Sequence, residues 1–233
     1  MKIRFFSMVA AALTLAACGS SPPTHFFALT AVAPVGRPPD APAFPVQVAA
    51  VHIPAMLDRE AMVRRTGPTA LSISDQDRWG APLDDMARNV LAQDLAERMP
   101  EGSVILPGAP LPSSTALLVV NIASFTQDAD RRVTLDGSWA LMHGRPAKTI
   151  LDRDVSLECK TDSDDAAAQA AAMSQLLAKL ADHIAITLST TSLQAASDHS
   201  SSGRQKEYSA PHSERTSTVQ IRTACAPDEK AGR

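Results

Sequence analysis

A short apolar leader at the N-terminus limits which part of this chain can belong to the folded protein. Lys2 and Arg4 carry positive charge, segment 5–17 is almost wholly apolar, and small residues precede Cys18. This is the order of parts in a secretory signal peptide. About a dozen apolar residues rise only about 18 Å as a helix, which is too short for a hydrocarbon core of about 30 Å. We therefore expect residues 1–17 to be a removed signal and not a permanent anchor.

The four residues Leu15-Ala16-Ala17-Cys18 resemble the lipobox of bacterial lipoproteins. The resemblance implies a diacylglyceryl group on the Cys18 sulfur, cleavage before Cys18, and acylation of the new amino terminus by a fatty acid such as palmitate. Several acyl chains anchor a protein stably, whereas one chain holds it only marginally. Gly19 is not the Asp that retains many such proteins at the inner membrane, so an outer-membrane location facing the periplasm is expected. The alternative is an ordinary signal peptide followed by an incidental cysteine.

Composition narrows the possible functions of the remaining part of the chain. After cleavage about 216 residues remain, enough for one domain with a real core and tails. The net charge of −3 provides no basic field that would attract nucleic acid. Aromatic residues make up only 4%, too few to build a carbohydrate or base-stacking platform. No later stretch reaches the eighteen or so apolar residues of a spanning helix, so membrane attachment is expected through the lipid alone.

Most of the chain between residues 25 and 160 carries short β patterns. Strands are predicted at 25–29, 46–53, 61–65, 71–74, 103–106, 116–125, 132–142 and 149–159. Segment 46–53 is apolar on both faces, which is typical of a strand buried on both sides. Linkers of several residues join the last three strands, and this spacing favours an antiparallel meander.

Two helical patterns complete the predicted domain. Apolar residues recur at three- and four-residue spacing over 83–99 and again over 173–188. Segment 162–165 offers capping oxygens for the start of the second helix, which is expected to end at about Thr187. The expected fold is α/β (α+β): a single domain with a mostly antiparallel sheet and two amphipathic helices packed on one face. We expect a lipidated tether at 18–24, the folded domain at 25–190, and a disordered polar tail at 191–233.

Two motifs resemble a known family of lipoproteins. The stretch Ile53-Pro54-Ala55-Met56-Leu57-Asp58-Arg59, continued by Met62-Val63-Arg64-Arg65, matches a PxYLDRxxxVxR pattern, and Asp77-Arg78-Trp79-Gly80-Ala81-Pro82-Leu83 matches DRWxxPL. These are patterns of the PqiC family, the auxiliary lipoproteins of membrane-integrity transport systems. Met56 departs from the pattern, since the family usually has an aromatic residue there. The resemblance covers about residues 15–190.

The PqiC resemblance implies a non-catalytic accessory protein without a cofactor. Members work with periplasmic mammalian-cell-entry (MCE) domain proteins, or with ABC-type transporters that carry them, and these assemblies move lipids or other hydrophobic molecules between the two membranes. The protein would dock its MCE partner at the outer membrane and would form a ring-shaped homo-oligomer. The alternative is a freestanding periplasmic lipoprotein that binds a small apolar ligand or peptidoglycan in the layer between helices and sheet.

Four residues are candidates for a partner or self-association surface. Leu57, Asp58 and Arg59 form a turn between two predicted strands, with one apolar and two charged side chains. Alternatively, Asp58 and Arg59 pair with each other and fix the turn. Trp79 is a candidate anchor because tryptophan is enriched at interface hot spots. Alternatively, it seals the core in front of the first helix.

The sequence contains no pattern of a catalytic or metal site. We find no Gly-x-Ser-x-Gly, no His-Glu-x-x-His and no Gly-rich phosphate loop, and the six histidines are scattered without ligand spacing. We therefore expect neither enzyme activity nor a bound metal. Cys159 and Cys225 are free to form a disulfide in the oxidising periplasm, but the sequence leaves their pairing open.

The lipobox yields a direct prediction. Cys18→Ala should abolish labelling by a fatty-acid probe and release the protein from membranes, because the acylated sulfur is lost. Labelling and membrane fractionation of cells measure both effects. Unchanged labelling would contradict the assignment of Cys18 as the lipidation site.

Overall fold

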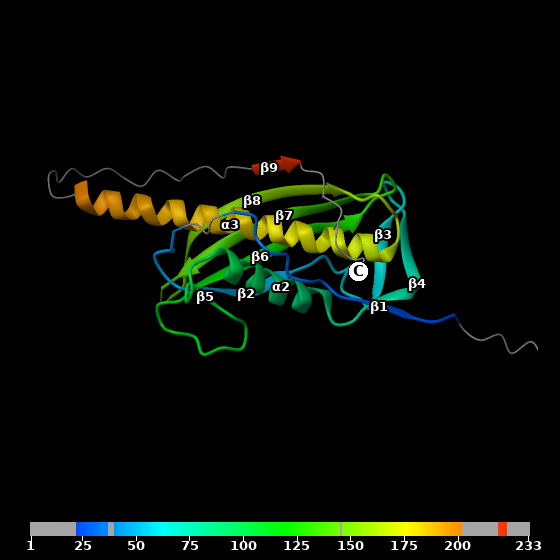
Figure 1. Cartoon of the computed structure of the whole chain (residues 1–233), viewed down its shortest axis with the longest axis horizontal. Helices are drawn as coiled ribbons and strands as arrows, with labels where there is room; N and C mark the ends of the chain where they lie inside the picture. The colour runs from blue at the N-terminus through cyan, green and yellow to red at the C-terminus, as the bar shows by residue number, and fades with distance from the viewer. Residues whose placement is uncertain (1–21, 37–39, 145, 202–218, 223–233) are drawn as a thin grey trace, which may run out of the picture.

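A computed structural model describes residues 22–36, 40–144, 146–201 and 219–222 (Figure 1). These residues form one α/β domain with a single sheet and two helices. The strands are β1 (His25–Phe27), β2 (Val46–His52), β3 (Ala61–Arg65), β4 (Leu71–Trp79), β5 (Val104–Ile105), β6 (Ala116–Gln127), β7 (Arg132–His143), β8 (Lys148–Lys160) and β9 (Val219–Arg222). The helices are α2 (Leu83–Arg98) and α3 (Ala166–Ser201).

The described strands form one mixed sheet in the order β1-β4-β3-β6-β7-β8-β9, with β2 pairing β5 and β6. Three pairings are antiparallel, including the predicted meander β6–β7–β8. The other five pairings are parallel, so the expectation of a mostly antiparallel sheet is wrong, while the α/β class is confirmed. The reason lies in β2 and β3, which follow one another along β6 in the same direction. The short strands β1, β5 and β9 then add parallel pairs that carry little sequence pattern.

The core lies between the sheet and the two helices. Both helices cover one face of the sheet, with α2 over β2 and β5 and α3 over β6, β7 and β8 (Figure 1). This layer is filled by fully buried side chains, the largest of which are Trp139, Phe125, Leu91, Leu95, Leu118, Leu135, Leu157, Met173, Leu176, Leu177, Leu180 and Ile184. Each such side chain contributes about 1.5–3 kcal/mol through burial. The packing of two helices on one face is therefore as expected.

The opposite face of the central sheet is polar. Asn121 of β6 is exposed and pairs with Ser138 of β7, whose own partner in β8 is Asp154. Beside them, Ser156 Oγ donates to Asp136 Oδ1 at 2.6 Å. This alternation between an apolar inner face and a polar outer face is what a half-solvated antiparallel sheet requires.

Helix α3 begins at a well-defined cap. The Ala168 N–H donates to Asp165 Oδ1 at 2.7 Å, so the Asp165 carboxylate satisfies one of the free N–H groups of the first turn. A hydrogen bond from Ser163 and then the one from Ala168 hold the pKa of Asp165 below its usual value. Acidic residues also occupy the first turn of α2, at Asp84 and Asp85, as the sequence pattern indicated.

The end of α3 differs from the prediction. The helix continues to Ser201, well beyond the predicted end near Thr187 and into the segment expected to be a disordered tail. The apolar stripe ends at Leu188, but the chain contains no Gly or Pro between there and Ser201 that would stop a helix. Strand β9 also lies within the predicted tail. The rest of that tail, residues 202–218 and 223–233, lies outside the described residues.

A charge network centred on the buried side chains of Asp94 and Arg98 ties both helices to the segment that follows β1. Arg98 of α2 donates from Nε to Asp182 Oδ1 of α3 at 2.6 Å and from Nη1 to the Val32 carbonyl at 3.0 Å. The Val32 N–H in turn donates to Asp94 Oδ1 at 2.8 Å. Burial raises the pKa of Asp94 to about 6, against the opposing effects of Val32 and Arg98. Removing one member of such a network leaves an uncompensated buried charge.

The close contact at Gly137 generates a prediction about the sheet. Gly137 of β7 lies opposite Ile122, where β6 carries a bulge, and an added Cβ would overlap the Asn121 carbonyl oxygen. Gly137→Ala should therefore lower the free energy of unfolding by about 1–3 kcal/mol, since the rigid backbone must shift. Urea denaturation measures the loss. The matched control is Gly67→Ala, whose Cβ would meet only Ala70 Cβ at 3.6 Å and should change stability by less than about 0.5 kcal/mol.

Candidate docking surfaces at the two ends of the domain

The sequence-predicted site residues lie at one end of the elongated domain. This end is formed by β1, β3, β4 and the start of α3 (Figure 1). The opposite end is formed by β5, the loop that follows it, and the turn between β7 and β8. Cys18 lies outside the described residues, but it precedes β1 closely in sequence. We call the first end the β1 end.

The turn between β2 and β3 separates its apolar residue from its charged ones. The Leu57 N–H donates to the Pro54 carbonyl at 2.8 Å, and the Arg59 N–H donates to the Leu57 carbonyl at 2.9 Å. These bonds fold the Leu57 side chain into the core, where only 4% of it is exposed, and leave Asp58 and Arg59 exposed. The hypothesis that Leu57 itself offers an apolar contact surface is therefore wrong for the folded protein.

Asp58 and Arg59 do not pair with each other. Within the described part of the chain, the ion pairs involve other residues, so the turn is held by its backbone hydrogen bonds and not by an internal Asp–Arg pair. Both charged side chains are consequently available to a partner.

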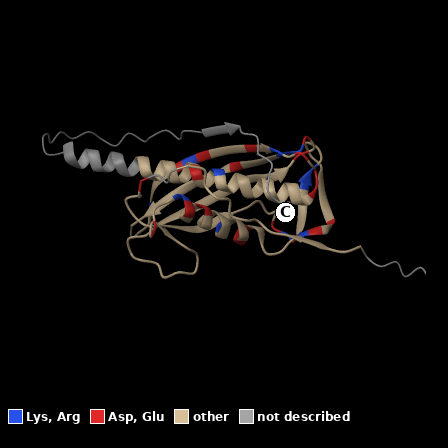
Figure 2. Ribbon diagram, viewed as in Figure 1, with Lys and Arg blue, Asp and Glu red and all other residues tan. Residues whose placement is uncertain are grey.

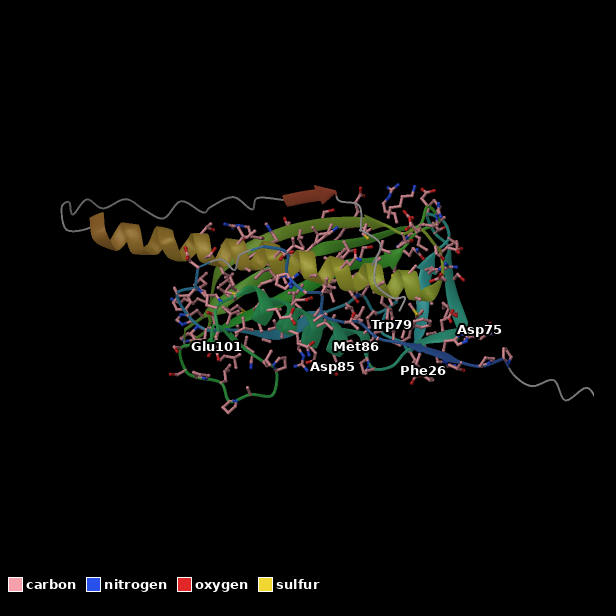
Figure 3. The ribbon with its side chains drawn as sticks, in the orientation of Figure 1. Phe26, Asp75, Trp79, Asp85, Met86 and Glu101 are labelled. Atoms are coloured by element: carbon pink, nitrogen blue, oxygen red, sulfur yellow. The ribbon has the colours of Figure 1, made fainter. Side chains whose placement is uncertain are left out.

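Trp79 is a core residue. Only 4% of the residue is exposed. The backbone N–H of Trp79 donates to the Glu60 carbonyl at 2.7 Å, and this bond joins the end of β4 to the start of β3. Figure 3 shows Trp79 at the end of β4 that lies toward α2, with Phe26 and Asp75 nearer to the tip of the β1 end. The structure therefore supports the interpretation that Trp79 seals the core in front of α2, and not the interpretation that it is an exposed interface anchor.

The structure nevertheless brings the two candidate segments together through their charged neighbours. Arg78 Nη1 donates to Glu60 Oε2 at 3.0 Å, and this exposed pair links β4 to the turn that holds Asp58 and Arg59. Exposed pairs of this kind contribute only about 0–1 kcal/mol to stability. Their arrangement matters more for recognition, because complementary charges select partners and fix register. We call Asp58, Arg59, Glu60 and Arg78 the charged surface; Figure 2 shows charges of both signs at this end.

A cleft of about 480 Å³ opens beside it, between β1, β3, β4 and the start of α3. His25 Nδ1 lies 3.2 Å from Asp77 Oδ1, because parallel pairing sets His25 opposite Asp77. Ser74 Oγ donates to Asp77 Oδ2 at 2.9 Å and accepts the Asp77 N–H. The serine thus bonds to the aspartate and not to the imidazole, which is the wrong order for an activated nucleophile. Its role is to hold the turn within β4.

The remainder of this cleft is also held by structural bonds. Arg64 Nη1 lies 3.6 Å from Asp164 Oδ2, and Gln169, only 2% exposed, donates from Nε2 to the Val63 carbonyl at 3.0 Å. Among the described residues, no three His, Cys, Asp or Glu side chains gather as a metal site would need. Sequence reasoning missed this cleft because its members come from four separated segments. The sequence carried no local signal for it, since β1 is aromatic apart from His25.

The opposite end carries exposed apolar side chains. Leu106 and Leu111 of the loop between β5 and β6, and Ile150 near the start of β8, are each nearly half exposed. The loop borders a hollow of about 260 Å³ that is closed on its other side by Met142 and His143 of β7. We call Leu106, Leu111 and Ile150 the distal apolar surface. The sequence shows the proline-rich loop, but not that its leucines face solvent.

The contrast between Trp79 and Arg59 yields a prediction. Trp79→Ala should lower the free energy of unfolding by about 3–5 kcal/mol, because it empties a buried aromatic site. Arg59→Ala should change it by less than about 0.5 kcal/mol, because the side chain is exposed and unpaired. Denaturant titration of both variants distinguishes them. Equal stabilities would contradict the placement of Trp79 in the core.

Comparison with known proteins identifies the family. Residues 27–185 match the family described as "ABC-type transport auxiliary lipoprotein component". Intermembrane transport lipoprotein PqiC of Escherichia coli (strain K12) is 29% identical over 93 residues, which is 40% of this chain and 49% of that protein. PqiC of Shigella flexneri gives the same values. The chain thus spans about half the length of the curated relatives it matches.

Solved structures share the fold. A crystal structure of an uncharacterized protein superposes with a TM-score of 0.61 at 23% identity, covering 71% of this chain and 99% of that one. A crystal structure of a protein from Xanthomonas campestris gives a TM-score of 0.60 at 18% identity, covering 73% and 99%. No described helix is long and apolar enough to cross a membrane. The family consists of transport components and not of enzymes. This chain belongs to the ABC-type transport auxiliary lipoproteins, and its assignment to the PqiC group is confirmed.

Proposed function

We propose that this protein is a non-catalytic, lipid-anchored subunit of an intermembrane transport system. It sits on the periplasmic face of the outer membrane and docks an MCE-domain protein there, in a system that moves lipids or other hydrophobic molecules. The observation that carries the proposal is the family match over residues 27–185, together with the lipobox that ends at Cys18.

The position of the anchor orients the domain. The seven residues from Cys18 to His25 span at most about 25 Å when fully extended. A lipid on Cys18 therefore keeps the β1 end against the membrane and directs the opposite end into the periplasm. In this orientation the charged surface lies at the level of neighbouring subunits, and the distal apolar surface faces a partner that arrives from the periplasm.

The distal apolar surface suits contact with the MCE partner, and the charged surface suits contacts between subunits. Exposed apolar surface is a candidate for protein contacts, and Leu106, Leu111 and Ile150 are exposed apolar residues of the far end. We assign them to the MCE partner. Balanced charges specify register between identical subunits, and we assign Asp58 and Arg59 to contacts within a homo-oligomeric ring.

The alternative of a freestanding protein that holds a ligand has less support. That function would place the ligand in the layer between helices and sheet. In the described residues this layer is occupied by fully buried side chains such as Leu176, Leu177 and Leu180. A packed layer favours a docking role over ligand storage.

Cross-linking in cells tests the proposal on the full-length lipoprotein. The double variant Leu106→Asp with Leu111→Asp should reduce the amount of cross-linked MCE-domain protein about tenfold, which corresponds to about 1.4 kcal/mol of lost contact. Arg59→Glu should reduce cross-links between copies of this chain. The control is Ile186→Asp on α3, an exposed apolar residue that belongs to neither of the two defined surfaces, which should leave both yields unchanged.

Other outcomes would count against this function. A strict monomer that forms no cross-link to an MCE-domain protein would exclude the docking role. Stoichiometric lipid extracted with such a monomer would instead support the freestanding ligand-binding protein.

A further inference from the structure

Cys159 forms a disulfide bond in the interior of the domain. It is the last core-facing residue of β8, with none of its surface exposed. The alternation along β8 places it on the same face as Val155 and Leu157, beneath α3. The sequence contains only two other cysteines, Cys18 and Cys225, and both lie outside the described residues.

The register of β9 indicates which cysteine is the partner. Strand β9 runs parallel along β8, from Val219 opposite Val155 to Arg222 opposite Glu158 (Figure 1). Cys159 is the next residue after Glu158, and Cys225 is the third residue after Arg222. Three residues reach about 10 Å, whereas neighbouring strands lie about 4.8 Å apart and bonded cysteines have Cα atoms about 5.5–6 Å apart. We infer that Cys159 is bonded to Cys225 of the same chain.

Cys18 is excluded on two grounds. First, its sulfur carries the lipid, a statement that rests on the proposed function. Second, β1 and β8 are separated by β4, β3, β6 and β7, which amounts to about 24 Å across the sheet. The tether would have to cross the whole sheet at nearly full extension to reach Cys159.

This bond holds β9 against β8 at the edge of the sheet. Four residues of β9 alone would hold the segment weakly, but a covalent link from Cys159, one residue beyond the paired part of β8, keeps β9 on β8. Strand β8 is thirteen residues long and, without β9, would present an open edge that can pair with other chains. The closed loop contains all of α3, and constraining so long a loop in the unfolded chain favours the folded state. The oxidising periplasm allows the bond to persist.

Peptide mapping of the full-length lipoprotein under non-reducing conditions tests the inference. Digestion should release one disulfide-linked pair of peptides that contain Cys159 and Cys225, with Cys18 recovered separately in acylated form. Cys225→Ser should lower the melting temperature by roughly 5–10 °C and speed hydrogen exchange at residues 155–158 of β8. The control Thr223→Ala changes the same segment without the sulfur and should affect neither quantity. Cys225→Ser avoids the packing defect that a change at buried Cys159 would introduce.

Each of the other results overturns a definite part of the inference. A Cys159–Cys18 link would refute both the pairing and the lipid anchor. A free Cys159 beside an acylated Cys18 would refute the pairing and leave the proposed function intact. A disulfide-linked dimer on a non-reducing gel would show that the bond joins two chains.

Discussion

The burial of one face of β6, β7 and β8 beneath α3 is the constraint on which the rest of this structure depends. These three strands form the long antiparallel part of the sheet, and their inner face supplies Leu118, Phe125, Trp139 and Leu157 to the core. A sheet with one apolar face must cover that face, and the long apolar stripe of α3 does so. The other strands are added at the margins of this unit, and their direction was free to be parallel.

The same packing separates two ends of the domain. Because α3 runs along the strands, the β1 end gathers β1, β3, β4 and the start of α3, and the loop after β5 is left at the far end (Figure 1). The charge network of Arg98, Asp94 and Asp182 joins the segment after β1 to both helices. In the proposed function, a lipid at Cys18 holds the β1 end at the membrane, and the distal apolar surface meets the partner.

Local sequence patterns predicted the helices and strands well, but they predicted less well which strands lie next to each other. The stripes of α2 and α3 and the alternation in β7 follow from local periodicity. Helix α2 and strand β7 were found where they were expected, whereas α3 continues to Ser201, beyond its predicted end. The mixed sheet was not predictable, because the pairing of β1 with β4 and of β2 with β6 joins segments far apart in the chain. For the same reason, no pattern in the sequence indicated that His25 and Asp77 lie next to each other. Leu57 and Trp79 were recognised as notable residues, but their burial depends on backbone contacts at Pro54 and Glu60.

By itself, the sequence determined the class of fold and the family, because both follow from short stretches of residue type and spacing. The proposed leader and the proposed lipobox at Cys18 are also read from such stretches. Only the tertiary structure decided which of the singled-out side chains face solvent. It placed Leu57 and Trp79 in the core, left Asp58 and Arg59 exposed, and collected Leu106, Leu111 and Ile150 at the far end. Exposure depends on what packs against a residue from elsewhere in the chain, and local pattern does not contain that information.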